Sequence, residues 1–150
     1  MSLSKTEKLF LDDLVVGDGF TSEEYTVDGN QIREFAQHFD PQPFHLDEEV
    51  ARETFFEGLA ASGWHTAAIT MRLLVRSVPL AGGIIGVGTE ISWPRPTRPG
   101  DTLHVVSTII GISPSKSKSD RGIVTVQSDT LNQRGELCQR SIAKLLVFRK

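Results

Sequence analysis

The sequence is poor in cysteine, in net charge and in long apolar runs, and each shortage removes a class of protein. The lone Cys138 excludes an internal disulfide and any site with several thiolate ligands, and it is typical of a reducing compartment. A net charge of -3 provides no basic surface for nucleic acid or an anionic membrane. No apolar run reaches the roughly 18 residues of a membrane span, and the N-terminus, MSLSKTEKLFLDDL, lacks a signal-peptide core. We therefore expect a cytoplasmic protein that binds neither nucleic acid nor membrane.

The length and composition of the chain suit a single domain. With 150 residues and 39% apolar side chains, the chain can bury a hydrophobic core without disulfides or a structural metal. No internal repeat divides it, and the one low-complexity patch, SPSKSKSD, is typical of a solvated hairpin tip. We therefore expect residues 1–150 to form one domain.

The first third of the chain is expected to contain an extended arm, a short strand and two helices. Charged residues mixed with Leu and Val indicate the arm up to Thr21, and the β-branched run from Phe20 to Val27 indicates the strand. Between Gln31 and Phe39 a helix is predicted by four apolar side chains at helical spacing, Ile32, Phe35, Ala36 and Phe39. A second short helix is expected over DEEVARET, whose acidic first turn suits the helix dipole.

The remainder of the chain combines one apolar helix with four strands. The helix is predicted from Gly63 to about Val78 and should be buried through a stripe of Trp64, Ala67, Ala68, Met71, Leu74, Val75 and Val78. Four β-rich runs follow, separated by turn signals: GGIIGVGTEISWP, DTLHVVSTIIGI, RGIVTVQSDTL and ELCQRSIAKLLVF. This order predicts an α+β fold in which an antiparallel β-sheet wraps around a central apolar helix.

The segment FDPQPFHL, residues 39–46, places an acid and an imidazole five residues apart at the end of a helix. Pro41 and Pro43 stop the helix and predict a stiff, irregular turn. Asp40 and His45 beside one water would form a general acid–base pair, because histidine changes charge near neutral pH. The structural alternative has Asp40 accepting hydrogen bonds from turn amides and His45 filling space, and the spacing alone favours this alternative.

The segment LAASGW precedes the apolar helix and provides a possible anion-stabilising group. Gly63 stands at the helix start, where backbone N–H groups lack intrahelical partners and face the positive end of the helix dipole. These donors suit an oxygen that becomes negative during a reaction. Gly63 is equally compatible with a tight packing contact. For Ser62 we expect a helix cap.

Three places in the chain together resemble the MaoC-like dehydratase family, which includes the R-specific enoyl-CoA hydratases and has the hotdog fold. The first is DPQPFHLD, residues 40–47, which is similar to the family's hydratase signature. The second is AASGWH before the central helix, and the third is the turn PTRPGDTL that leads into a strand. The similarity extends from about Leu11 to Phe148.

The resemblance implies a hydro-lyase that needs no metal and no cofactor beyond the coenzyme A of its substrate. Asp40 and His45 would flank a water, and would deliver its hydroxyl to C3 and a proton to C2 of a trans-2-enoyl thioester, giving a (3R)-hydroxyacyl thioester. The backbone N–H of Gly63 would hold the thioester carbonyl. We expect Gln42, Ser62 and Trp64 to lie near the substrate, although core packing is the favoured role of Trp64.

The sequence departs from the family at three positions close to these groups. Phe39 stands where the family usually has Gly, Gln42 where it has Asn, and Ser62 where it has His. The acid, the imidazole and the glycine are kept. We therefore expect the departures to alter the shape of the substrate site.

The same resemblance implies an acyl-CoA as the small-molecule partner and a homodimer or dimer of dimers as the assembly. Arg72, Arg95 and Arg98 are candidates for the phosphates of coenzyme A, although a packing role is favoured for each. Two other functions stay open, a hotdog acyl-CoA thioesterase and a non-catalytic acyl-thioester binding protein. The spacing of Asp40 and His45 speaks against the thioesterase.

Overall fold

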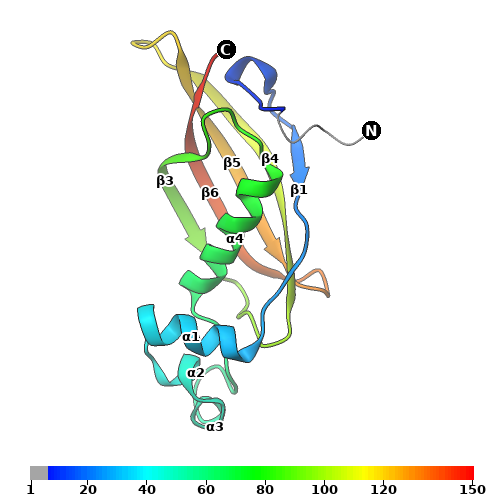
Figure 1. Ribbon diagram of the computed structural model, residues 1–150, viewed down its shortest axis with the longest axis vertical. Helices are drawn as coiled ribbons and strands as arrows, with labels where there is room; N and C mark the ends of the chain where they lie inside the picture. Colours follow the sequence, from blue (N-terminus) through cyan, green and yellow to red (C-terminus); the bar gives the residue numbers. More distant parts are fainter. Residues whose placement is uncertain (1–6) are drawn as a thin grey trace.

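A computed structural model describes residues 7–150 as a six-stranded antiparallel sheet with the long helix α4 lying across one face (Figure 1). The strands are β1 (Gly19–Thr21), β2 (Tyr25–Thr26), β3 (Ile85–Ser92), β4 (Thr102–Pro114), β5 (Arg121–Leu131) and β6 (Leu137–Phe148). The helices are the 3-10 turn η1 (Leu11–Asp13), α1 (Gly29–Phe39), α2 (Pro43–Leu46), α3 (Glu48–Arg52) and α4 (Gly63–Ser77). The predicted α+β arrangement of one central helix and four long strands is confirmed.

The sheet has the strand order β1-β4-β5-β6-β3, with β2 also paired to β4. The turns SPSKSKSD and NQRG join β4, β5 and β6 into successive hairpins, as the sequence predicts. Side chains of β5 alternate strictly between buried and partly exposed, because successive residues of a strand point to opposite faces. Strand β3 pairs only with β6 among the described residues, so it forms one edge of the sheet.

Helix α4 turns a different face to the sheet from the one predicted. The buried side chains are His65, Thr66, Ile69, Thr70 and Leu73, whereas much of the predicted apolar stripe is exposed. The buried hydroxyls are paired across the interface: Thr66 donates to Thr97 at 2.9 Å, and Thr70 and Thr130 share a bond of 2.6 Å. Apolar residues occupy two sides of α4. The buried side is the one whose threonines find hydrogen-bond partners, Thr130 on the sheet and Thr97 in the turn before β4.

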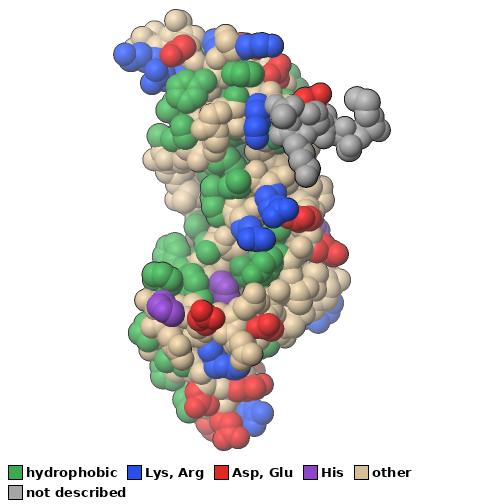
Figure 2. All heavy atoms as spheres, viewed as in Figure 1, with side chains coloured by type: hydrophobic (Ala, Val, Ile, Leu, Met, Phe, Trp, Pro, Cys, Tyr) green, Lys and Arg blue, Asp and Glu red, His purple; other side chains and the backbone are tan. Residues whose placement is uncertain are grey.

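The exposed side of α4 continues onto the edge strand. Trp64 is 59% exposed, Met71 41%, Val75 57% and Val87 of β3 59%. The expectation that Trp64 packs in the core is therefore wrong for the single chain. In Figure 2 apolar side chains gather along the middle of the same view, where Figure 1 places α4 and β3.

Helix α1 begins with a capping box and ends at the predicted Phe39. Asp28 accepts a hydrogen bond from the Gln31 amide at 2.8 Å, and the Gln31 side chain accepts one from the Asp28 amide at 2.9 Å. Ile32 and Ala36 are fully buried as predicted, but Phe39 is 73% exposed. The apolar stripe of α1 therefore ends one turn before its last residue.

Two local predictions need correction. The strand expected over residues 20–27 is interrupted, because β1 and β2 are separated at residues 22–24. The proline segment is not wholly irregular, because Pro43 begins the single helical turn α2. A proline at the first helical position loses no intrahelical hydrogen bond, so it starts this turn as readily as it stops the previous helix. None of the helices within residues 7–150 has the length and apolarity needed to cross a lipid bilayer.

The two faces of β4 give a direct test of where the core lies. Val105 is fully buried and contacts the cluster around Ile69 and Leu73, whereas its neighbour Val106 is 36% exposed on the opposite face. We expect Val105→Ala to lower the free energy of unfolding by about 2 to 3 kcal/mol, because it removes buried carbon and leaves a cavity. The matched Val106→Ala should cost at most about 1 kcal/mol. Urea denaturation measures both, and equal losses would contradict this assignment of faces.

Candidate functional site

Asp40 and His45 meet directly at the junction of α1 and α2. Asp40 is the C-terminal cap of α1, and His45 lies in the helical turn that Pro43 begins. The Oδ2 atom of Asp40 lies 3.2 Å from Nε2 of His45. Backbone hydrogen bonds from the Gln42 amide to the Asp40 carbonyl and from the His45 amide to the Gln42 carbonyl, 2.8 and 2.9 Å long, fix the bend between them. The acid and the imidazole predicted from the sequence therefore form one pair.

The second ring nitrogen of His45 fixes the proton that faces Asp40. His45 Nδ1 lies 2.6 Å from the carbonyl oxygen of Ala60, which can only accept a hydrogen bond. Nδ1 therefore carries a proton, and a neutral ring leaves Nε2 as an acceptor toward the carboxylate. Two acceptors do not attract each other at this distance, so the contact requires one further proton, on Nε2 or on Asp40. The pair is built to hold a single exchangeable proton.

The carboxyl group of Asp40 is held in its ionised form. Burial raises the pKa of Asp40, but hydrogen bonds from the Gln42 and Ser62 side chains and attraction to His45 outweigh it, so that the pKa lies below its usual value. Gln42 Nε2 donates to Oδ1 at 2.5 Å, which leaves Oδ2 to face His45. The ionised carboxyl of Asp40 therefore faces Nε2 of His45 across the 3.2 Å contact. Gln42 acts here through Asp40, a role its sequence position alone did not reveal.

The start of α4 presents a free backbone donor to the same space. Ser62 is fully buried and caps α4 by accepting a hydrogen bond from the Trp64 amide at 3.2 Å, as predicted. Within residues 7–150 the N–H of Gly63 has no hydrogen-bond partner. A Cβ atom on Gly63 would lie 2.7 Å from the ring of Trp93, so no larger side chain fits there. Both uses considered for Gly63, tight packing and an available donor, are present in the structure.

One cavity of about 600 Å³ joins these groups. Its wall includes Asp40, His45 and Gly63, together with the aromatic rings of Phe44, Phe55, Phe56, Trp64 and Trp93. Trp64 thus lines the candidate site, the alternative role considered for it. The cavity combines an acid, an imidazole and an unpaired amide in apolar surroundings, where electrostatic interactions are stronger than in water. Such a site can exchange a proton with a bound molecule while stabilising a negative oxygen.

Arg98, proposed from the sequence only as a packing residue or a phosphate ligand, fastens the loop that positions His45. Its guanidinium donates to the carbonyl oxygens of Phe56, Gly58 and Leu59 at 2.5, 3.1 and 3.3 Å. The next residue in that loop, Ala60, supplies the carbonyl that orients His45. Sequence reasoning singled out the turn PTRPGD but had no signal for this contact, because the two segments lie about 40 residues apart.

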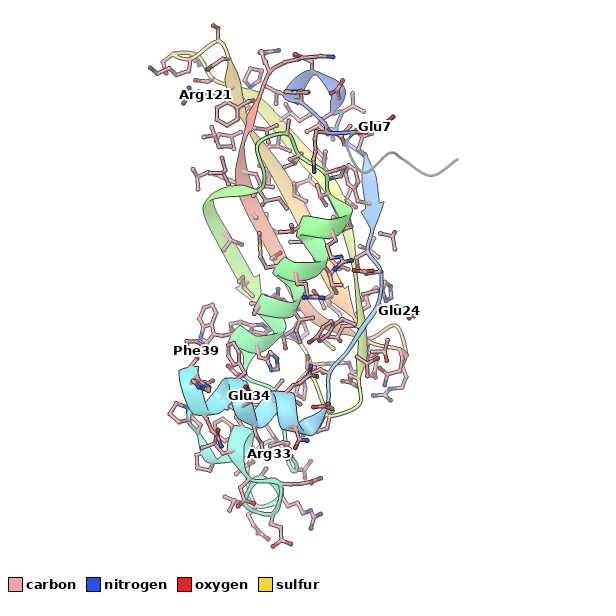
Figure 3. The ribbon with its side chains drawn as sticks, viewed as in Figure 1. Glu7, Glu24, Arg33, Glu34, Phe39 and Arg121 are labelled. Atoms are coloured by element: carbon pink, nitrogen blue, oxygen red, sulfur yellow. The ribbon has the colours of Figure 1, made fainter. Side chains whose placement is uncertain are left out.

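Other residues considered from the sequence lie outside the cavity. Phe39, labelled in Figure 3 at the C-terminal end of α1, packs on Phe35 and does not line the cavity. His38 makes a local hydrogen bond to the Glu34 carbonyl at 2.9 Å. The buried Nδ1 of His65 has no hydrogen-bond partner among the described residues, and burial lowers the pKa of His65. The bulk of Phe39 therefore does not reshape this site.

Comparison with known proteins identifies the class to which this fold and site belong. The family model described as "MaoC like domain" matches residues 15–132, and the chain belongs to this family. A solved structure of a MaoC-like dehydratase from Rhodospirillum rubrum is 68% identical, with a TM-score of 0.93 over 95% of this chain and 98% of that one. The hotdog fold expected from the sequence is thereby confirmed.

Two curated relatives differ in what their names state. An uncharacterized protein of Bacillus subtilis is 34% identical over 127 residues, which is 83% of this chain and 88% of that protein. An (R)-specific enoyl-CoA hydratase of Rhodospirillum rubrum is 30% identical over 92 residues, which is 61% of this chain and 63% of that protein.

The environment of Asp40 is directly measurable. We expect Gln42→Leu to raise the pKa of Asp40, because it removes a hydrogen bond to the ionised carboxyl. Carbon-detected NMR titration of Asp40 measures this change. Gln37→Leu, the same substitution at an exposed position of α1, is the control and should leave the titration unchanged. An unaltered Asp40 titration in Gln42→Leu would contradict the contact.

The lowered pKa of Asp40 also makes the free energy of unfolding depend on pH. Since the folded pKa of Asp40 lies below its unfolded value of about 3.9, the ionised group stabilises the fold above that pH. The stabilisation disappears as the pH falls through the folded pKa. Gln42→Leu should therefore lower the free energy of unfolding at pH 6 and have a smaller effect near pH 3.

Proposed function

We propose that this protein is a hydro-lyase that reversibly adds water to a trans-2-enoyl-CoA, giving a (3R)-hydroxyacyl-CoA. The observation that carries the proposal is the convergence of the Asp40–His45 pair and the unpaired Gly63 amide on one cavity. Membership of the MaoC-like family and similarity to a relative named as an (R)-specific enoyl-CoA hydratase support it.

With one proton on the Asp40–His45 pair, both proton transfers of hydration can occur in one step. The ionised Asp40 accepts a proton from the bound water as its oxygen bonds to C3, and His45 Nε2 donates its proton to C2. The C2–C3 double bond becomes a single bond, and one proton enters and one leaves the pair. The proton on Asp40 then returns to His45 across the 3.2 Å contact, which restores the starting state. Dehydration follows the same steps in reverse.

Gly63 is the group that would stabilise charge on the thioester. During hydroxyl addition, negative charge develops on the carbonyl oxygen as an enolate. The N–H of Gly63, unpaired within residues 7–150 at the positive end of α4, would donate to that oxygen. One such donor typically contributes about 10²- to 10³-fold in rate. No side chain larger than hydrogen fits at this position, which keeps the amide accessible.

Of the three arginines considered for coenzyme A, Arg95 is the best placed. It lines the cavity, and its side chain is 60% exposed and forms an ion pair with Glu136 at 3.4 Å. Arg98 is engaged by loop carbonyls, and Arg72 lies over the ring of Tyr25. Arg95 is therefore the proposed contact for an anionic thioester handle at the cavity mouth.

Two alternative functions differ from hydration in their products. A thioesterase would use the same cavity but release a free thiol, and an acyl-thioester binding protein would bind substrate without converting it. The Asp40–His45 pair suits hydration, since that reaction takes a proton from the water that attacks C3 and supplies a proton to the neighbouring C2.

We also propose a homodimer in which two copies pair along strand β3. Its outer edge has no backbone partner within the described residues, and apolar side chains of β3 and α4 are exposed beside it. An unpaired, apolar edge strand is a ready surface for a second strand.

Substitution of the pair tests the proposed chemistry. Asp40→Asn and His45→Gln should each reduce hydration of crotonyl-CoA by at least about 100-fold, because each removes one end of the proton transfer. Loss of the enoyl absorbance measures the rate, and circular dichroism checks that the fold is retained. Activity close to wild type in either variant would refute the assignment.

A thiol-release assay on the same samples separates hydration from thioester hydrolysis. Binding of the thioester with neither signal would favour the binding protein.

The dimer is tested by adding charge to the edge strand. Val87→Lys should convert the protein to a monomer, because an edge lysine opposes pairing of a second strand. Val50→Lys, the same substitution at an exposed valine of α3, should leave the mass unchanged. Light scattering after size-exclusion chromatography gives the mass, and a dimeric Val87→Lys protein would contradict pairing through β3.

A further inference from the structure

A second cavity lies between α4 and the sheet and is not used by the proposed chemistry. It has a volume of about 190 Å³. Its wall is largely apolar and includes Ala67 and Leu74 of α4, Ile91 of β3, Val126 of β5 and Leu145 of β6. An apolar chamber of this kind suits a hydrocarbon chain.

The two cavities follow one another along the same helix and the same strand. Gly63 and Thr66 line the larger cavity, and Ala67 and Thr70, on the next turn of α4, line the smaller one. On the other side, Ile91 of β3 lines the smaller cavity, and Trp93, directly after the end of β3, lines the larger one. The chamber therefore extends the catalytic cavity along the groove between α4 and β3.

Trp93 lies at the junction and is held in place from both sides. Three atoms of its ring lie within 2.7 to 2.9 Å of the position that a Cβ on Gly63 would take, so the indole packs against the start of α4. Its Nε1 donates to Oε1 of Gln139 at 2.9 Å. Gln139 is 1% exposed and lines the smaller cavity, so this hydrogen bond ties the ring to the chamber wall. The edge of the Trp64 ring contacts it, at 5.3 Å between centroids.

We propose that Trp93 closes the inner chamber and thereby restricts the enzyme to short-chain enoyl thioesters. The inference rests on the proposed function, because it names the substrate class of the same site. Trp93 is the specificity-determining residue: the chamber offers space for a longer acyl chain, and the indole lies between Gly63 of the catalytic cavity and Gln139 of the chamber wall.

Opening the junction should change the preferred chain length. The wild-type protein should have a higher kcat/KM for crotonyl-CoA than for trans-2-octenoyl-CoA. Trp93→Leu should raise the ratio of the octenoyl to the crotonyl value at least tenfold, since each buried methylene contributes about fourfold. Trp93→Phe, which keeps an aromatic ring but loses the bond to Gln139, should give a smaller rise and serves if Trp93→Leu does not fold.

Refilling the chamber provides the matched control. Ala67→Leu places a larger side chain in the inner cavity, which Ala67 lines. In the double variant with Trp93→Leu, the ratio should return to within about threefold of the wild-type value. A gain that survives Ala67→Leu would show that the longer chain lies elsewhere, and it would overturn the proposal. An unchanged ratio in Trp93→Leu and Trp93→Phe, or a wild type that prefers octenoyl-CoA, would overturn it equally.

Binding measurements separate this proposal from the proposed chemistry. In the Asp40→Asn background, calorimetry with butanoyl-CoA and octanoyl-CoA reports chain preference without turnover. Trp93→Leu in that background should increase the octanoyl to butanoyl affinity ratio at least tenfold. A wild type that hydrates no enoyl-CoA would end the proposed function, while this affinity ratio still decides whether Trp93 closes the chamber.

Discussion

The candidate site depends on one hydrogen bond, from His45 Nδ1 to the carbonyl of Ala60. That bond selects the ring tautomer, and the tautomer determines that Nε2 is the nitrogen that exchanges its proton. Without it, the contact with Asp40 could form through either nitrogen and would specify no direction of proton transfer. Ala60 belongs to a loop without regular structure, and Arg98 supplies the rigidity that the loop lacks. The chemistry of one imidazole therefore rests on a guanidinium from a distant turn.

The hotdog architecture explains how these segments come together. Helix α4 crosses the sheet with threonines on its buried face, and the bonds from Thr66 to Thr97 and from Ala61 N–H to the Thr97 carbonyl fasten its start to the turn before β4. That turn carries Arg98. The amide of Gly63, the loop that holds His45 and the clamp on that loop are thus connected through a few buried contacts.

Sequence reasoning succeeded where a signal was local or periodic and failed where partners were distant. The Ser62 cap and the four strands follow from short patterns, the proximity of Asp40 and His45 follows from the family resemblance, and the structure has each where it was expected. The buried face of α4 could not be chosen, because Leu73 and Val75 are equally apolar and only the facing side chains of the sheet decide between them. Trp93, Ala60 and Arg98 act through contacts with no repeating spacing, so the sequence did not reveal these roles.

The binding mode of Arg98 has a further electrical consequence. Its guanidinium is held by neutral carbonyl oxygens, and no carboxylate of the described chain forms an ion pair with it. Carbonyl dipoles solvate a cation but do not cancel its charge. A chain of net charge -3 thus holds a guanidinium in the turn next to Thr97, which lines the cavity. Its field adds to that of Arg95 at the cavity mouth and favours the approach of anions.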